Sequence, residues 1–210
     1  TPQRPGLPLR PETLTIHSTG NPGSSAQNER DNLARPGNTR LAGFHIVVDE
    51  KEAIECLPLN EVAWHAGDGR AAGGGNMASI GLEICESGDR EATLFRAARV
   101  AAYILSRQGW GTEQLRQHYD WSGKNCPRIL RDTGRWDWFV ARVEEELEEL
   151  TMVRYRTLDD VPQGEFRQVI GRLMQSGLLK GDGSGVIDLS RDMVRMLVIL
   201  YRAGYFDRAV

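Results

Sequence analysis

The residues of this chain that could carry out chemistry are two imidazoles and a thiol. His118 and Cys126 stand on either side of a glycine-containing loop, and Lys124 lies two positions before the cysteine. His17 lies far upstream, at the end of a strand-like run. Three nitrogen and sulfur donors without a fourth are typical of a catalytic zinc site, in which one coordination position is left to water. The rest of the chain would then bring His17 to this loop or present a substrate to the metal.

Each donor taken alone also has a structural explanation. A single histidine on a strand is more often a hydrogen-bonded structural residue than a metal ligand. The spacing of His118 and Cys126 is also not that of a zinc ribbon. The combination favours a metal site, because the positive charge of Lys124 beside the thiol would stabilise the thiolate form.

The elements that must position these residues alternate between strand and helix patterns. Residues 13–17 alternate polar and apolar side chains and run into a cluster of turn residues, so we expect His17 at a strand end that faces a loop. Further strands are expected at residues 43–49, 53–57, 79–86 and 114–118. Helices are expected after an N-cap at Ser24 or Ser25, at 89–108 with Asp89 as the cap, after Pro127, and at 136–150. This alternation predicts an α/β fold in which helices cover a sheet.

Composition and charge exclude several other classes of protein. The net charge of −3, without a stripe of lysine and arginine, gives no support for binding to nucleic acid. No apolar run approaches the ~18 residues that a membrane span needs. Residues 1–6 show neither an apolar core nor a small-residue cleavage pattern, so we expect no secretory signal. Three cysteines without a C-x-x-C pair do not form a disulfide framework.

Four ordered motifs resemble the type 2 N-acetylmuramoyl-L-alanine amidases, and the nearest branch resembles the endolysins of Bacillus-type phages and prophages. The motifs are TLTIHSTGNP at 13–22, VAWHAG at 62–67, SIGLEIC at 79–85 and HYDWSGKNCP at 118–127. The resemblance covers roughly residues 10–147. It implies a mixed sheet flanked by helices and Zn²⁺ bound by His17, His118 and Cys126. It also implies hydrolysis of the amide that joins N-acetylmuramic acid to the L-alanine of the peptidoglycan stem peptide.

Two further residues are candidates for the chemistry of such a reaction. Glu83 is the expected general base, because its neighbours Leu82 and Ile84 point to the opposite face of the strand and leave Glu83 facing the groove. An outward-facing carboxylate, or one paired with an arginine, is the structural alternative. Lys124 would stabilise the negative charge that develops on the substrate oxygen. Its alternative role is that of an exposed solubilising lysine.

Candidate substrate-binding residues are Trp64, His65 and Asn21. His65 precedes a glycine-rich stretch at residues 71–76, which we interpret as a mobile surface loop bordering a groove; the alternative for His65 is a packing histidine that caps a turn. His45 is assigned to the core or to the region behind the metal ligands. A phage-lysozyme branch of the family has a tyrosine where this chain has Phe44, so the role of that tyrosine cannot be carried over.

Residues 151–210 form the second predicted domain, small and helical, after a zinc amidase domain at 1–150. Two helix-sized segments, 164–176 and 190–203, are joined by a turn-rich connector. This part resembles half of a surface-layer-homology-like unit, which implies anchoring to the wall. The rival role is a homodimer formed through apolar helix faces, namely Phe166, Val169, Ile170, Leu173, Met193, Leu197 and Leu200.

Two other functions remain open at this stage. A peptidoglycan-binding module that does not cut its ligand generally lacks a ligand such as Cys126, so the complete donor set disfavours it. A zinc peptidase that cuts within the stem peptide would use similar groups. In each case the expected partner is the bacterial cell wall, and the expected route is synthesis in the cytoplasm followed by action on the wall.

Overall fold

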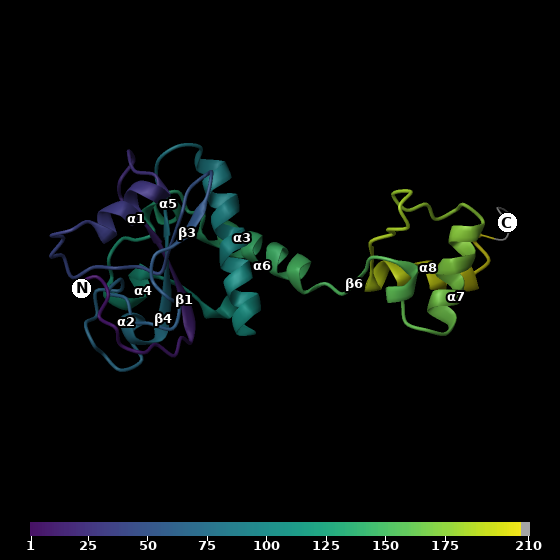
Figure 1. The fold of residues 1–210 in the computed structure, drawn as a ribbon, viewed down its shortest axis with the longest axis horizontal. Coiled ribbons are helices and arrows are strands. Elements are labelled where there is room, and N and C mark those ends of the chain that lie inside the picture. The colour runs from purple at the N-terminus through teal and green to yellow at the C-terminus, as the bar shows by residue number, and fades with distance from the viewer. Residues whose placement is uncertain (207–210) are drawn as a thin grey trace. The chain divides into compact units, whose positions relative to one another are not determined.

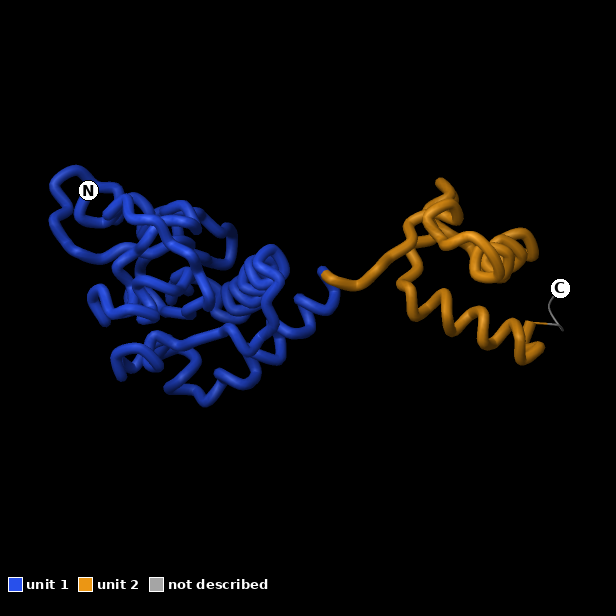
Figure 2. Tube along the Cα trace, turned by 90° about the horizontal axis from the view of Figure 1, so that it is seen from below, with its two compact units in different colours: residues 1–150 blue, residues 151–210 orange. Residues whose placement is uncertain are grey.

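The computed structural model describes residues 1–206, and the chain divides into two compact units, Thr1–Leu150 and Thr151–Val210. Figure 2 shows unit 1 in blue and unit 2 in orange. The last four residues of the predicted C-terminal domain, 207–210, lie outside the described residues. None of the helices within residues 1–206 combines the length and the apolar composition that crossing a membrane requires.

Unit 1 is built on a five-stranded mixed sheet with the order β3-β2-β4-β1-β5. Its strands are β1 Thr13–Ser18, β2 Ile46–Val48, β3 Ala53–Glu55, β4 Ser79–Ile84 and β5 Leu115–Gln117. The central strand pairs are parallel, and only β3 runs antiparallel to its neighbour β2. The predicted mixed sheet with flanking helices is confirmed.

Two helices of unit 1, α1 Ala26–Ala34 and α3 Arg90–Gln108, begin at residues whose side chains cap the first turn. The Ser25 side chain accepts a hydrogen bond from the Asn28 backbone, and Asp89 does the same for Ala92, as the sequence predicts. The other helices of unit 1 are α2 Gly75–Ala78, α4 His118–Ser122, α5 Arg128–Arg131 and α6 Trp136–Thr151, with a 3₁₀ turn η1 Thr112–Gln114. Figure 1 shows α3 beside the sheet, where it packs against β1, β2, β3 and β4.

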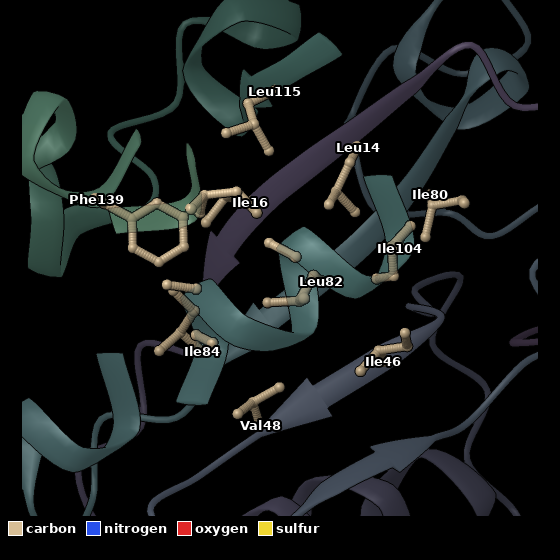
Figure 3. Close-up of a cluster of buried hydrophobic side chains, with 14 of the residues drawn as sticks. Leu14, Ile16, Ile46, Val48, Ile80, Leu82, Ile84, Ile104, Leu115 and Phe139 are labelled. Carbon is tan, nitrogen blue, oxygen red and sulfur yellow. The ribbon is translucent and has the colours of Figure 1, made fainter. Parts of the chain in front are cut away.

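One face of the sheet forms the apolar core. Leu14 and Ile16 of β1 lie beside Leu82 and Ile84 of β4 and are fully buried, together with Phe139 of α6 (Figure 3). Full burial of each such side chain stabilises the fold by about 1.5–3 kcal/mol. The core therefore fixes the positions of β1 and β4 relative to each other.

The opposite face of the same two strands carries polar residues. Because side chains alternate along a strand, the residues between the core leucines and isoleucines point to this second face. Thr15 pairs in register with Gly81, and His17 pairs with Glu83. The sheet register thus places the first predicted metal ligand beside the predicted general base.

Unit 2 has its own small core. It contains the two-stranded antiparallel sheet of β6 Arg154–Tyr155 and β7 Leu189–Ser190, the 3₁₀ turn η2 Leu158–Asp160, and the helices α7 Glu165–Gln175 and α8 Arg191–Arg202. Val169 and Leu173 of α7 pack against Val198 of α8 and are almost fully buried.

This core corrects part of the predicted dimer surface. Val169, Ile170 and Leu173 are buried within unit 2 because they face α8, so they are not available to a second chain. The exposed apolar residues of α8 are instead Met193, which the sequence analysis included, and Met196 and Ile199, which it did not.

Candidate metal centre

The three predicted ligands meet at the carboxyl end of β1. The Nδ1 atoms of His17 and His118 are 3.0 Å apart, and the Sγ atom of Cys126 is 3.8 Å from Nδ1 of His17. All three side chains are buried, and their donor atoms lie within 4.8 Å of one another. Zinc bond lengths of 2.0–2.3 Å place the ligand atoms of a tetrahedral site about 3.3–3.6 Å apart. The spacing in this structure fits such a site.

The loop that carries two of the ligands is shaped by α4. His118 is the first residue of this helix, directly after β5, and the Asp120 carboxylate accepts a hydrogen bond from the backbone of Gln117. Gly123 ends the helix with a φ of 71°, a left-handed conformation that glycine adopts without strain. The Cys126 carbonyl then accepts a hydrogen bond from the Tyr119 backbone at 3.0 Å, which returns the thiol to the histidine.

The protonation of His17 follows from its hydrogen bonds. His65 donates from Nε2 to the Ser79 carbonyl at 3.0 Å, because a carbonyl oxygen can only accept. Burial lowers the pKa of His65 to about 3, so the ring is neutral and its Nδ1 is an acceptor. That Nδ1 lies 2.9 Å from Nε2 of His17, which must therefore donate. The lone pair of His17 is left on Nδ1, the atom that faces His118 and Cys126.

His118 presents its lone pair toward the same point. A backbone hydrogen bond with Ala66 raises the pKa of His118, although burial, the larger effect, lowers it to about 4. The ring is thus a donor to Ala66, and Nε2 lies on the side of the neighbouring Gly67. Two imidazole nitrogens without protons repel each other at 3.0 Å unless a cation lies between them. This donor set fits a metal ion better than it fits a hydrogen-bonded histidine pair.

Cys126 completes the set. The Ser18 backbone N–H donates to Sγ at 3.4 Å, and burial raises the pKa of the thiol to about 11. A thiol in this environment loses its proton when a cation binds, since metal binding releases protons from its ligands.

Glu83 stands beside the three donors with unused hydrogen-bonding capacity. Its Oε2 atom is buried and has no hydrogen-bond partner within the described part of the chain. Burial raises the pKa of Glu83 to about 8, and the charge of Lys124 acts against this rise. No described arginine forms an ion pair with this carboxylate, so the structural alternative of an arginine pair does not apply.

A pocket opens over the site from the side of Glu83 and His118. Lys124, Trp64 and Phe44 also line it, and the Arg70 guanidinium lies 5.7 Å from the ring centre of Trp64. The sequence analysis missed the polar residues that complete the wall, which are Glu29 and Asn32 of α1 and Asn38 and Arg40 of the following loop. These residues carry no motif of their own, and their position follows only from the path of the chain after β1.

The other two predicted substrate residues lie in different positions. Asn21 does not line the pocket, and its side chain donates to Glu29 at 3.3 Å. His65 touches the pocket but is only 7% exposed, and both of its nitrogens already have partners. Both ring nitrogens of His65 are thus engaged within the protein, and its contact with a substrate stays a prediction. His45 is buried with both nitrogens bonded to the backbone, as expected of a core residue.

The end of the glycine-rich stretch is part of the structure rather than a mobile surface loop. Gly75 and Asn76 begin α2, and both are buried. The Asn76 side-chain oxygen accepts hydrogen bonds from the backbones of His65 and Ala66, at 2.7 and 2.8 Å. The glycine run was the available signal, because glycine permits the close backbone approach that this turn needs.

An ion pair between the buried carboxylate of Glu86 and the exposed side chain of Arg128 connects the segments around the site. Glu86, just after β4, accepts a hydrogen bond from the Gly20 backbone at 3.0 Å and one from Nε of Arg128 at 2.8 Å. It thereby connects the turn after His17 with the residues that follow Cys126. The sequence analysis did not identify this pair, since the two residues are far apart in the chain.

The chain is similar in sequence to known proteins. The family described as N-acetylmuramoyl-L-alanine amidase matches residues 7–129. The N-acetylmuramoyl-L-alanine amidase XlyB of Bacillus subtilis is 46% identical over 140 residues, which are 65% of this chain and 43% of that protein. The amidase CwlA of the same organism is 40% identical over 147 residues, 68% of this chain and 53% of that protein. The chain thus spans about half the length of these curated relatives.

A solved structure extends the likeness to the fold. The catalytic domain of XlyA superposes on this chain with a TM-score of 0.62 at 38% sequence identity. The match covers 68% of this chain and 92% of that domain.

Proposed function

The chain belongs to the N-acetylmuramoyl-L-alanine amidase family, and from that premise we propose that it hydrolyses peptidoglycan with zinc bound by His17, His118 and Cys126. The bond cut is the amide between N-acetylmuramic acid and the L-alanine of the stem peptide. The single observation that carries the zinc proposal is the meeting of the Nδ1 atoms of His17 and His118 and the sulfur of Cys126 within 4.8 Å of one another. When bound there, zinc would lower the pKa of a water toward ~7 and polarise the substrate carbonyl.

Glu83 would carry the proton in this reaction. Its free Oε2 atom faces the same end of the strands as the ligands, so it can accept a proton from the attacking water. A pKa near the working pH lets one group take a proton and release it again, and burial sets the pKa of Glu83 to about 8 in the metal-free site. The same carboxyl would then protonate the leaving nitrogen of L-alanine.

Lys124 would stabilise the charge that forms on the substrate oxygen. It lines the pocket together with Glu83 and His118, and its charge acts on both Glu83 and Cys126. An ammonium group held at this point interacts more strongly with the transition state than with the neutral amide. Trp64, on the same wall, offers an apolar ring for the substrate to rest on.

The decisive test identifies the bond that is cut. Purified peptidoglycan is incubated with the chain, and the released fragments are analysed by mass spectrometry and by labelling of new amino termini. Glycan free of peptide, together with new L-alanine amino termini, is the expected result. New termini within the stem peptide would show a peptidase instead, and wall that is bound but unchanged would show a binding module.

A second test addresses the metal. Dialysis against a strong chelator should abolish lysis of the wall, and added zinc should restore it. Full activity of chelated protein that contains no zinc by elemental analysis would contradict the zinc proposal but not the amidase proposal.

The role of unit 2 stays a prediction with two forms, anchoring to the wall and homodimerisation. The exposed residues Met193, Met196 and Ile199 follow one another at helical spacing along α8 and offer an apolar surface for either role. If the chain forms a homodimer through this surface, Met196→Asp should prevent its formation. Analytical ultracentrifugation, which measures the molar mass in solution, tests this. A wild-type chain that is monomeric and sediments with purified wall would favour anchoring.

A further inference from the structure

His65 and Ala66 together contact both imidazole ligands. The His65 ring meets His17, with 2.9 Å between His65 Nδ1 and His17 Nε2. The next residue, Ala66, provides the backbone group that hydrogen-bonds to His118. Two neighbouring residues thus reach two ligands that are far apart in the sequence.

The sheet leaves room for His65 at one position. Gly81 of β4 lies under the ring, and a Cβ atom there would be 2.8 Å from Cγ of His65. Real Cβ atoms essentially never approach other atoms so closely. The absence of a side chain on β4 therefore allows His65 to reach the back of His17.

Buried hydrogen bonds hold the two residues in place. Nε2 of His65 donates to the Ser79 carbonyl, at the start of β4. The Asn76 amide oxygen accepts from the backbones of His65 and Ala66, and its nitrogen donates to the Gly69 carbonyl at 3.1 Å. Asn76 is 3% exposed, so water does not compete for these bonds.

We propose that His65 is a positioning residue, which keeps the proton of His17 on Nε2 and so presents the Nδ1 lone pair to the metal. The relay runs from the Ser79 carbonyl, which can only accept, through the His65 ring, which in its neutral form then accepts at Nδ1 from Nε2 of His17. Asn76 keeps the His65 ring in position because its amide oxygen binds the backbones of His65 and Ala66. The proposal rests on the zinc site proposed above. Groups that orient a ligand in this way typically change metal affinity by 10–100-fold when they are removed.

Two substitutions at one position separate the acceptor from the rest of the side chain. In His65→Asn the amide oxygen stands near the former Nδ1 and can still accept from His17. In His65→Gln the amide nitrogen stands near the former Nε2, so the bond to the Ser79 carbonyl is kept while the acceptor for His17 is lost. Zinc affinity is measured on the whole chain by competition with a chromophoric chelator. We expect a loss of about 10–100-fold for His65→Gln and a change within about threefold for His65→Asn.

Absorption of the cobalt-substituted protein provides a second readout that does not depend on activity. A change of ligand field is expected in His65→Gln and not in His65→Asn. Equal zinc affinity of both variants and the wild type would overturn the proposal while leaving the zinc site intact. Equal loss in both variants would also overturn it, because the acceptor would then not be the group that matters. A wild-type chain that binds no zinc would overturn the proposed function itself.

Direct observation of the tautomers keeps the proposal falsifiable if a variant does not fold. Long-range proton–nitrogen NMR correlations on the zinc-free wild-type chain report which ring nitrogen carries the proton. Protonated Nε2 in both His17 and His65 is the expected pattern. A proton on Nδ1 of His17 would overturn the proposal.

Discussion

The two faces of β1 and β4 satisfy opposite requirements with the same backbone. On one face Leu14, Ile16, Leu82 and Ile84 are fully buried, and packing alone decides their positions. On the other face Thr15, His17 and Glu83 stand at the intervening positions, and hydrogen bonds hold the side chains of Thr15 and His17. The apolar face contributes stability, whereas the polar face contains groups that are costly to bury.

The difference between the two faces separates the residues that stabilise the fold from those proposed to take part in the reaction. On the polar face nearly every ring nitrogen has a partner, yet one carboxylate oxygen of Glu83 is left without one. An unpartnered buried oxygen costs free energy, and such groups are found where chemistry requires them. Changes on the two faces should therefore have separate consequences, one on stability and the other on turnover.

The largest expected effect is on turnover, from Glu83→Gln. Loss of the proton carrier should reduce kcat by about 10³-fold, within the range for general acid–base groups. Zinc content should remain at the wild-type level, because the ligands on the same face are unchanged. Turnover is measured by release of L-alanine amino termini, with Leu82→Met on the apolar face as the matched control. Retention of more than a tenth of the wild-type activity would show that Glu83 is not the proton carrier.

A somewhat smaller loss should follow from Lys124→Met. Removal of a charge that stabilises the transition state typically lowers kcat by about 10²–10³-fold. Lys51, an exposed lysine of the β2–β3 turn, provides the control substitution, since it is outside the pocket. If Lys51→Met and Lys124→Met lowered kcat equally, general charge rather than position would explain the effect.

The apolar face should respond in stability instead. Leu82→Ala removes a fully buried side chain, so the free energy of unfolding should fall by about 2–5 kcal/mol. Urea unfolding measures this loss, and zinc affinity is determined below the transition. The folded variant should bind zinc like the wild type. A variant with normal stability and weakened zinc binding would break the separation between the faces.

The smallest predicted effect links the polar face to pH. Burial raises the pKa of Glu83 from 4.5 to about 8, so the folded zinc-free chain holds a proton that the unfolded chain releases. The stability of the wild type should therefore fall as pH rises from about 5 to 8, relative to the neutral variant Glu83→Gln. The variant should be more stable at pH 8 by about 2 kcal/mol, less than the full shift implies because the side chain is partly exposed.

Thermal or urea unfolding of both zinc-free chains at pH 4.5 and pH 8 tests this. The two chains should have similar stability at the lower pH. A difference in unfolding free energy that does not change with pH would show that folding does not raise the pKa of Glu83.

Local chemistry made much of the fold predictable from the sequence. The caps at Ser25 and Asp89 are local, so they could be read directly. The alternation of side chains along a strand was enough to predict that Glu83 points to the opposite face from Leu82, beside His17. The three candidate ligands could be predicted because only a few residue types bind zinc.

Long-range contacts explain what could not be predicted. The position of His65 depends on a glycine in β4 and on a carbonyl at the start of that strand, and no local sequence pattern connects them. Asn76 stood in a stretch whose composition indicates flexibility, whereas its amide is fully engaged once the chain has folded. In unit 2, apolar periodicity identified the helices but not which apolar face is covered by the neighbouring helix.

The register between β1 and β4 has a practical consequence for anyone preparing this protein. A slip of one residue would place Leu82 or Ile84, rather than Glu83, next to His17 and would turn alternate side chains to the wrong face. A mispaired sheet would thus lose the proposed ligand geometry and the proposed proton carrier in the same event. If the proposed site binds zinc, the molar zinc content of a purified batch measures the fraction of correctly folded molecules before any assay on cell walls is run.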